Sequence, residues 1–182
     1  RLPMRTELAR PTVLGTPGAP NSTLTANLGP TGHGLAHSPV VPAAGAPATV
    51  RAELTDPDGI GTVTLHYAVN GGAFQEVTMT STGNGAEYAG TIPGQASGLP
   101  VQFYIEAADA DLLTRTWPGP VLDEAGAPLG QVANALYQVD DEAYPGDAPL
   151  YKLIMLETER AELEAIGSAT GDEKYTDAQM NG

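Results

Sequence analysis

Four carboxylates in two short segments are the side chains best suited to chemistry. Asp56 and Asp58 flank a proline in TDPDG, and Asp109 and Asp111 stand two apart in AADAD. Oxygen ligands gathered in loops are what Ca²⁺ prefers. If both segments emerge at the same end of a fold, the four carboxylates predict a calcium site. The competing interpretation is that Asp-Pro-Asp-Gly only forms a turn and that the second pair solvates a loop tip.

The remaining reactive side chains do not form a catalytic pattern. His33 and His37 lie four apart in a Gly-rich stretch without helical support, and His66 is expected to point outward from a strand. No serine lies in a G-x-S-x-G elbow, and the GNG and GIG segments are not followed by a helix that could bind phosphate. We therefore predict no catalytic residue and no cofactor other than the possible calcium ion.

The charge balance restricts the partners. The 22 acidic and 8 basic side chains give a net charge of -14, which repels nucleic acid phosphates and anionic lipid surfaces. No apolar run approaches the roughly 20 residues that a membrane-spanning helix needs. We expect neither nucleic acid binding nor membrane insertion. The absence of cysteine, in an exported protein, favours a bacterial source over a disulfide-linked animal domain.

The elements that would position these residues are short strands. The 22 Gly and 16 Pro fit many turns, and hydrophobic residues alternate with polar ones through the centre of the chain. Asp-Pro-Asp-Gly and Asn70-Gly71-Gly72 predict turns between the strands. The residues predicted to face the core are Val50, Ala52, Leu54, Val63, Leu65, Tyr67, Val69, Tyr88, Ile92, Val101, Phe103, Ile105 and Ala107.

This spacing predicts a mainly β fold over residues 38–118, an immunoglobulin-like or fibronectin type III-like antiparallel sandwich of about seven strands. The early strand would lie at Pro39–Pro42. The segments TVRAELTDPDGIGTVTLHYAVNGG, YAGTIPGQ and VQFYIEAADAD resemble the fibronectin-like modules of large secreted bacterial proteins. Such modules carry no activity of their own.

Aromatic residues raise the alternative of a carbohydrate-binding sandwich, since exposed aromatics on a flat sheet can hold sugars. Tyr104 and Trp117 are the candidates for exposure, because Tyr67, Tyr88 and Phe103 fall on predicted core faces. Two aromatics at unrelated positions do not form a stacking platform. The sequence therefore favours structural roles for them.

The flanks predict a multidomain setting. Residues 1–37 are expected to be a linker or the tail of a preceding domain, residues 119–147 a second linker, and residues 148–182 the incomplete start of another domain. In that last part we predict a buried strand at Ala148–Leu156, then a helix at Glu159–Ile166 with Thr158 as its N-cap and Gly167 as its end.

Both flanks resemble known families. GTPGAPN is similar to the closing residues of a lamin tail domain. PLYKLIMLETERAELEAIGS followed by YTDAQMNG resembles the opening of the CotH kinase family, whose nucleotide and metal residues would lie beyond Gly182. The resemblance implies a non-catalytic spacer or interaction module preceding a CotH-type domain in a bacterial extracellular or cell-surface protein. Its partners would be neighbouring domains, an extracellular protein or a glycan. The alternatives are part of a secreted kinase-like enzyme and a calcium- or carbohydrate-binding sandwich.

Overall fold

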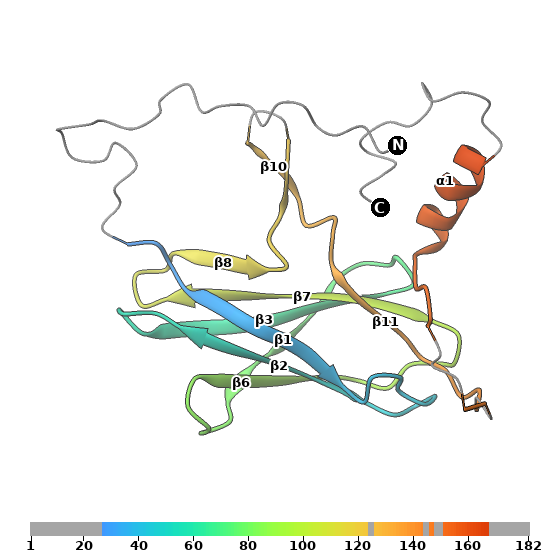
Figure 1. Cartoon of the computed structure of the whole chain (residues 1–182). Coiled ribbons are helices and arrows are strands. Elements are labelled where there is room, and N and C mark those ends of the chain that lie inside the picture. The colour runs from blue at the N-terminus through green and yellow to red at the C-terminus, as the bar shows by residue number, and fades with distance from the viewer. Residues whose placement is uncertain (1–26, 124–125, 144–145, 148–150, 168–182) are drawn as a thin grey trace.

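Two antiparallel sheets lie face to face in the computed structural model, which describes residues 27–123, 126–143, 146–147 and 151–167 (Figure 1). The first sheet has the order β1 (Thr31–Ser38), β2 (Ala48–Thr55), β6 (Glu87–Ile92), β5 (Thr80–Ser81). The second has the order β11 (Ala135–Gln138), β7 (Pro100–Asp109), β3 (Ile60–Val69), β4 (Gln75–Thr78).

Three shorter strands complete the β structure. β8 (Thr114–Trp117) pairs with β7, and β9 (Val121–Leu122) pairs with β10 (Pro128–Gly130) in a separate hairpin. An immunoglobulin-type sandwich places its first, second, fifth and fourth strands in one sheet and its third, sixth and seventh in the other. This chain has that arrangement, with β4 added as an extra edge strand. The predicted fold class, a mainly β antiparallel sandwich followed by a short helix, is confirmed.

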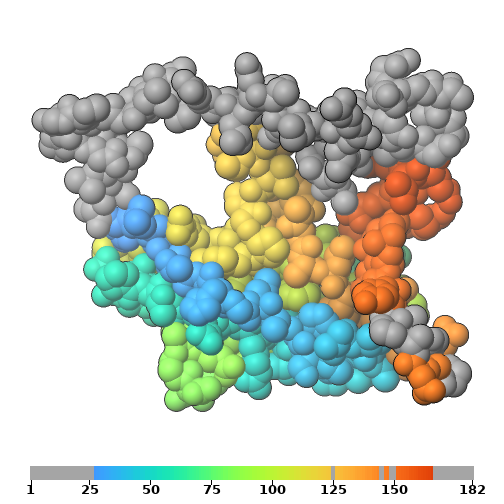
Figure 2. Space-filling model, in the orientation of Figure 1, coloured from blue at the N-terminus to red at the C-terminus, as the bar shows by residue number. Residues whose placement is uncertain are grey.

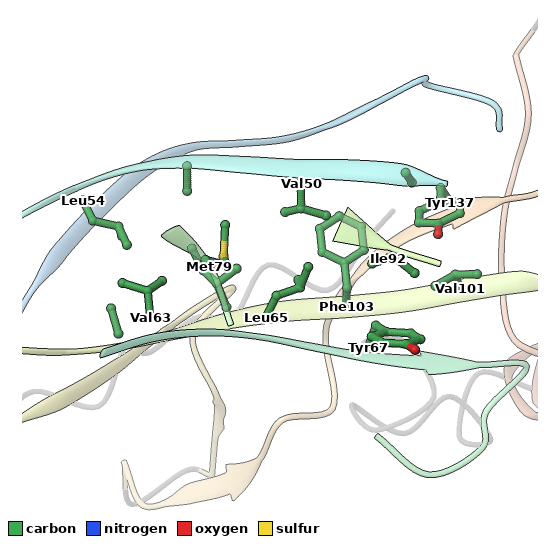
Figure 3. Close-up of a cluster of buried hydrophobic side chains, with 14 of the residues drawn as sticks. Val50, Leu54, Val63, Leu65, Tyr67, Met79, Ile92, Val101, Phe103 and Tyr137 are labelled. Atoms are coloured by element: carbon green, nitrogen blue, oxygen red, sulfur yellow. The ribbon is translucent and has the colours of Figure 1, made fainter. Parts of the chain in front are cut away.

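The core lies between the two sheets. Alternate residues of β2 point toward alternate residues of β3 and β7, as Figure 3 shows for Val50 and Leu54 opposite Val63, Leu65 and Phe103. Burying one Val, Leu or Phe side chain completely stabilises the folded state by about 1.5–3 kcal/mol relative to leaving it exposed. The predicted core residues are confirmed as buried or partly buried, and the core also includes Met79, Tyr137 and Val139.

The first strand differs from the prediction. Residues 39–42 form no strand, whereas β1 lies just before them and pairs with β2 from Thr31 to Ser38. Pro39 and Pro42 cannot donate ladder hydrogen bonds, which explains why pairing stops at this point. The residues of β1 include Gly32 and Gly34 and have low strand propensity. Their pairing with β2 decides their conformation.

The sandwich also extends past the predicted limits of 38–118. β1 lies in the predicted first linker, and β11 lies in the second. β11 pairs with one half of β7, and Tyr137 is 2% exposed. Sequence alternation marked neither strand because each is short or interrupted by glycine. The lamin-tail-like segment falls within residues 1–26, outside the described residues.

The C-terminal extension lies on the side of the second sheet that faces away from the first (Figure 1). The predicted buried strand at Ala148–Leu156 is wrong over the part described, residues 151–156, which form no strand and leave Tyr151 90% exposed. Residues 148–150 are outside the described residues. A short apolar run has no periodicity that separates a strand from other buried segments.

Helix α1 (Glu157–Gly167) confirms the predicted helix. The predicted N-cap was wrong. The Glu159 carboxylate accepts a hydrogen bond from the backbone N–H of Leu156 at 2.7 Å, which is the returning half of a capping box. Leu156 therefore holds the N-cap position, and Thr158 lies in the first turn.

Trp117 closes the sandwich at the edge formed by β1 and β8. Its indole ring packs against the core and lies directly over Gly32, where an added Cβ would come within 2.5 Å of Cε2 of the ring. Only a glycine permits this approach. Trp117, which the sequence analysis considered for sugar binding, thus connects β8 of the second sheet to β1 of the first.

We expect Gly32→Ala to lower the free energy of unfolding by about 1–3 kcal/mol, because the methyl group overlaps the indole ring. Chemical denaturation measures the loss. Gly119→Ala is the matched control, since its Cβ would meet no atom closer than Thr116 O at 4.0 Å. The cost of Gly32→Ala should fall in a Trp117→Leu background. An equal cost in both backgrounds would contradict the contact.

Candidate functional site

An aromatic cluster lies on the outer face of the second sheet. His66 on β3 and Tyr104 on β7 are register partners, and their rings stack with centroids 4.6 Å apart and planes 7° apart. Phe74, just before β4, meets Tyr104 edge-on with centroids 5.2 Å apart. We call His66, Phe74 and Tyr104 the aromatic platform.

The core determines where this platform lies. Leu65 and Tyr67 point inward from β3, so His66 between them must point outward. Tyr104 lies in the same way between Phe103 and Ile105 on β7. The left-handed backbone at Asn70 and Gly71 makes the tight turn that returns the chain toward β4 and places Phe74 at its start.

Carboxylates surround the platform. Glu76 is the register partner of His66 on β4, and Glu106 lies two residues beyond Tyr104 on the same face of β7. Burial, then the charges of Glu106 and Glu76, raise the pKa of the Tyr104 hydroxyl above its usual range. This hydroxyl therefore stays protonated at ordinary pH and can donate a hydrogen bond. Nε2 of His66 is buried and has no hydrogen-bond partner among the described residues.

The strands β11, β7, β3 and β4 carry no Lys or Arg side chain. Arg51 pairs with Glu87, Lys152 with Asp140, and Arg160 with two glutamates of α1. Arg115 on β8 is the register partner of the buried Ala107 and shares its side of the sheet. Carboxylates therefore outnumber Lys and Arg on these four strands.

A groove lies next to the platform. It has a volume of about 300 Å³ and is bounded by the outer face of β7 and β11 and by the C-terminal segment with α1. Its lining includes Gln102, Asn134, Leu136, Leu153, Glu162 and Leu163. Gln102 precedes Tyr104 by two positions on β7, so the groove continues the platform along the same strand. We call it the C-terminal groove.

The aromatic predictions were only partly right. Tyr104 is on the outer face, as considered, but Trp117 packs over Gly32 instead. Phe74 and His66 were missed as members of the platform. The stacking of His66 on Tyr104 depends on the register between β3 and β7, strands that are far apart in the sequence. No local signal specifies that register.

The four predicted calcium ligands occupy loops at one end of the sandwich. Ile60, which follows the Asp-Pro-Asp-Gly turn, is the register partner of Asp109, so the two segments lie at the same end of the sandwich. Within the described residues, however, no three acidic or histidine side chains gather in a metal-binding arrangement. Asp56 accepts a hydrogen bond from the N–H of Asp58 at 2.8 Å, as turn chemistry predicts. The calcium site stays a prediction.

Asp109 has a structural role in its loop. It is 1% exposed and accepts hydrogen bonds from the amide of Asn27 and from the N–H groups of Asp111 and Leu113, at 2.9 and 2.8 Å for the latter two. Burial alone would raise the pKa of this carboxyl, but these hydrogen bonds outweigh burial and hold the pKa below its usual range. Asp111 itself is exposed.

The other two histidines lie apart from each other. His33 Nε2 is 2.9 Å from Glu53 Oε2, while His37 packs its ring against Tyr137 and Phe103. His66 points outward, as predicted. Within the described residues no helix is long and apolar enough to span a bilayer.

Comparison with known proteins points to one class of module. The sequence model described as carbohydrate binding module family 56 matches residues 44–110, which is more than a third of the chain. The match runs from the segment before β2 to the end of β7 and contains all three residues of the aromatic platform. Over this region the chain is similar to a carbohydrate-binding module.

A solved structure is also similar. The crystal structure of a bromine derivative of BhCBM56 aligns with 14% sequence identity and a TM-score of 0.39, covering 59% of this chain and 97% of that one. A search of curated proteins found no match.

We expect Asp109 to make stability depend on acid pH. Because its pKa is lower in the folded state than the ordinary Asp value of about 3.9, its stabilisation is complete above that value. The stabilisation is lost as pH falls through the native pKa. Urea unfolding across acid pH should show a shallower loss for Asp109→Asn than for the wild type. Asp111→Asn, on the same exposed loop, is the control. Equal acid slopes for Asp109→Asn and the wild type would contradict this role.

Proposed function

We propose that this chain is a non-catalytic carbohydrate-binding module whose aromatic platform binds a glycan. The observation that carries the proposal is the Tyr104–His66 stack on the outer face of a sheet, within the region similar to a carbohydrate-binding family. The sandwich supplies a rigid support, and the platform and its carboxylates supply the contacts.

The chemistry of the platform suits a sugar. A pyranose ring has an apolar face of C–H groups that can pack on aromatic rings, and a rim of hydroxyls. Tyr104 and Phe74 offer aromatic surface beside the acceptors Glu76 and Glu106, and hydrogen bonds to ionised acceptors are the stronger kind. The protonated Tyr104 hydroxyl adds a donor.

The wider setting belongs to the same proposal. We place the module in an extracellular or cell-surface bacterial protein, adjacent to a CotH-type domain and following a lamin-tail-like domain, on the basis of the resemblances at its two flanks. In such a protein the sandwich would hold neighbouring domains apart while anchoring them to a polysaccharide. Any kinase-like chemistry would belong to the neighbouring domain.

We expect the chain to bind at least one polysaccharide in a panel of cellulose, chitin, chitosan, xylan and starch. Tyr104→Ala should weaken binding to that polysaccharide at least tenfold, about 1.4 kcal/mol, because it removes the central ring of the platform. Affinity electrophoresis or pull-down with the insoluble polymer measures the change.

Tyr151→Ala is the matched control, since Tyr151 is 90% exposed and lies outside the platform. It should bind like the wild type. Unchanged binding of a folded Tyr104→Ala variant would remove the platform from the function. Failure of the wild type to bind any member of a broad glycan panel would overturn the proposal itself and favour the spacer role alone.

A further inference from the structure

The C-terminal groove contains a buried acceptor without a hydrogen bond among the described residues. The Asn134 side-chain amide donates hydrogen bonds to Gln102 Oε1 at 3.1 Å and to Gln131 O at 3.2 Å, so both of its N–H groups have partners. Asn134 Oδ1 is buried without a hydrogen-bond partner among the described residues. A buried acceptor without a hydrogen bond lowers the stability of the fold, and a ligand that donates a hydrogen bond to it would remove this cost.

Helix α1 adds carboxylates to the same groove. Glu159 uses one oxygen to cap the helix at Leu156. Glu162 is exposed on the helix and takes no part in the ion pairs that join Arg160 to Glu157 and Glu164. In Figure 2 the C-terminal segment and α1 form the orange-to-red ridge at the right of the molecule. The helix thus adds two ionised acceptors to the groove.

The rest of the lining is apolar. Leu136 on β11 faces the groove from the sheet, and Leu153 and Leu163 face it from the extension. Leu153 and Leu163 are also 83% and 53% exposed, which is unusual for two neighbouring leucines. A suitable ligand therefore has an apolar body and a cationic donor.

We propose that the C-terminal groove is a second subsite that binds an amino-sugar residue of the glycan held by the aromatic platform. This proposal rests on the proposed function and adds a substrate class to it. The sugar ring packs against the leucines, and its ammonium group donates to the carboxylates beside Asn134. Gln102 and Tyr104 lie about 7 Å apart along one face of β7, so one chain can occupy both places.

Charge favours this ligand over other glycans. Glu76 and Glu106 lie beside the platform, and Glu159 and Glu162 line the groove. The strands β11, β7, β3 and β4 carry no Lys or Arg to offset them. The two described cations of the extension are already paired, Lys152 with Asp140 and Arg160 with Glu157 and Glu164. A uronic-acid or sulfated polysaccharide would be repelled along this path, and a polymer carrying free amines would be attracted.

The test compares glucosamine oligomers with N-acetylated oligomers of equal length, by calorimetry on the whole chain at a pH where the amines are protonated. We expect the free-amine oligomers to bind about tenfold more tightly, with the preference decreasing as salt is added. Glu162→Gln should remove most of the preference.

Asp58→Asn is the control, because it removes the same charge from an exposed turn at the opposite end of β7, beside Asp109. It should keep the preference and thereby exclude an effect of net charge alone. Thermal melting of Glu162→Gln and Asp58→Asn establishes that both are folded.

Three outcomes would overturn the subsite. Equal affinity for the two oligomers, with both lost in Tyr104→Ala, would retain glycan binding and exclude the amino-sugar subsite. Poly-lysine binding that depends on Glu162 but not on Tyr104 would show that the groove recognises positive charge alone. Absence of binding to either oligomer would also end this proposal, while the polysaccharide panel separately decides the proposed function.

Discussion

The pairing of β3 with β7 is the interaction on which the rest of the structure depends. It places Leu65 beside Ile105 and Tyr67 beside Phe103 inside the sandwich, and by the same register it places His66 beside Tyr104 outside. A shift by one residue would exchange the two faces and expose the core. The burial of the inner side chains therefore fixes the stacking of the outer rings. Stability and the candidate binding surface have one physical origin.

Much of the fold could be predicted from the sequence, because strands with one buried face alternate in hydrophobicity. Val50, Ala52 and Leu54 show this period clearly, and the turns between strands are marked by Asp-Pro-Asp-Gly and Asn-Gly-Gly. β1 could not be predicted, since its glycines hide the pattern and only pairing with β2 holds it extended. The site was harder to predict, because Phe74 and Tyr104 meet only after the strands have been aligned across the sheet.

The acidic residues show how similar sequence signals can acquire different roles. Asp56 and Asp109 both lie in turn-like segments, but Asp56 caps a surface turn while Asp109 is buried and binds three donors. Asn27, which lies before β1, is one of those donors. The carboxylate that looked available for a metal instead connects the start of the described chain to the end of β7. The two aspartates differ in role because Asp109 is buried and Asp56 is not, and the sequence alone does not report burial.

The edge of β7 is shared between two strands, with β11 paired to residues 100–103 and β8 to residues 105–108. The chain leaves the sheet after β8 and returns at β11, and the β9–β10 hairpin between them pairs with neither sheet. Length changes in this hairpin would leave every ladder hydrogen bond of the sandwich in place. The connection is therefore a natural point for insertions, and its tip is a suitable position for a label or a fused domain that leaves the two sheets intact.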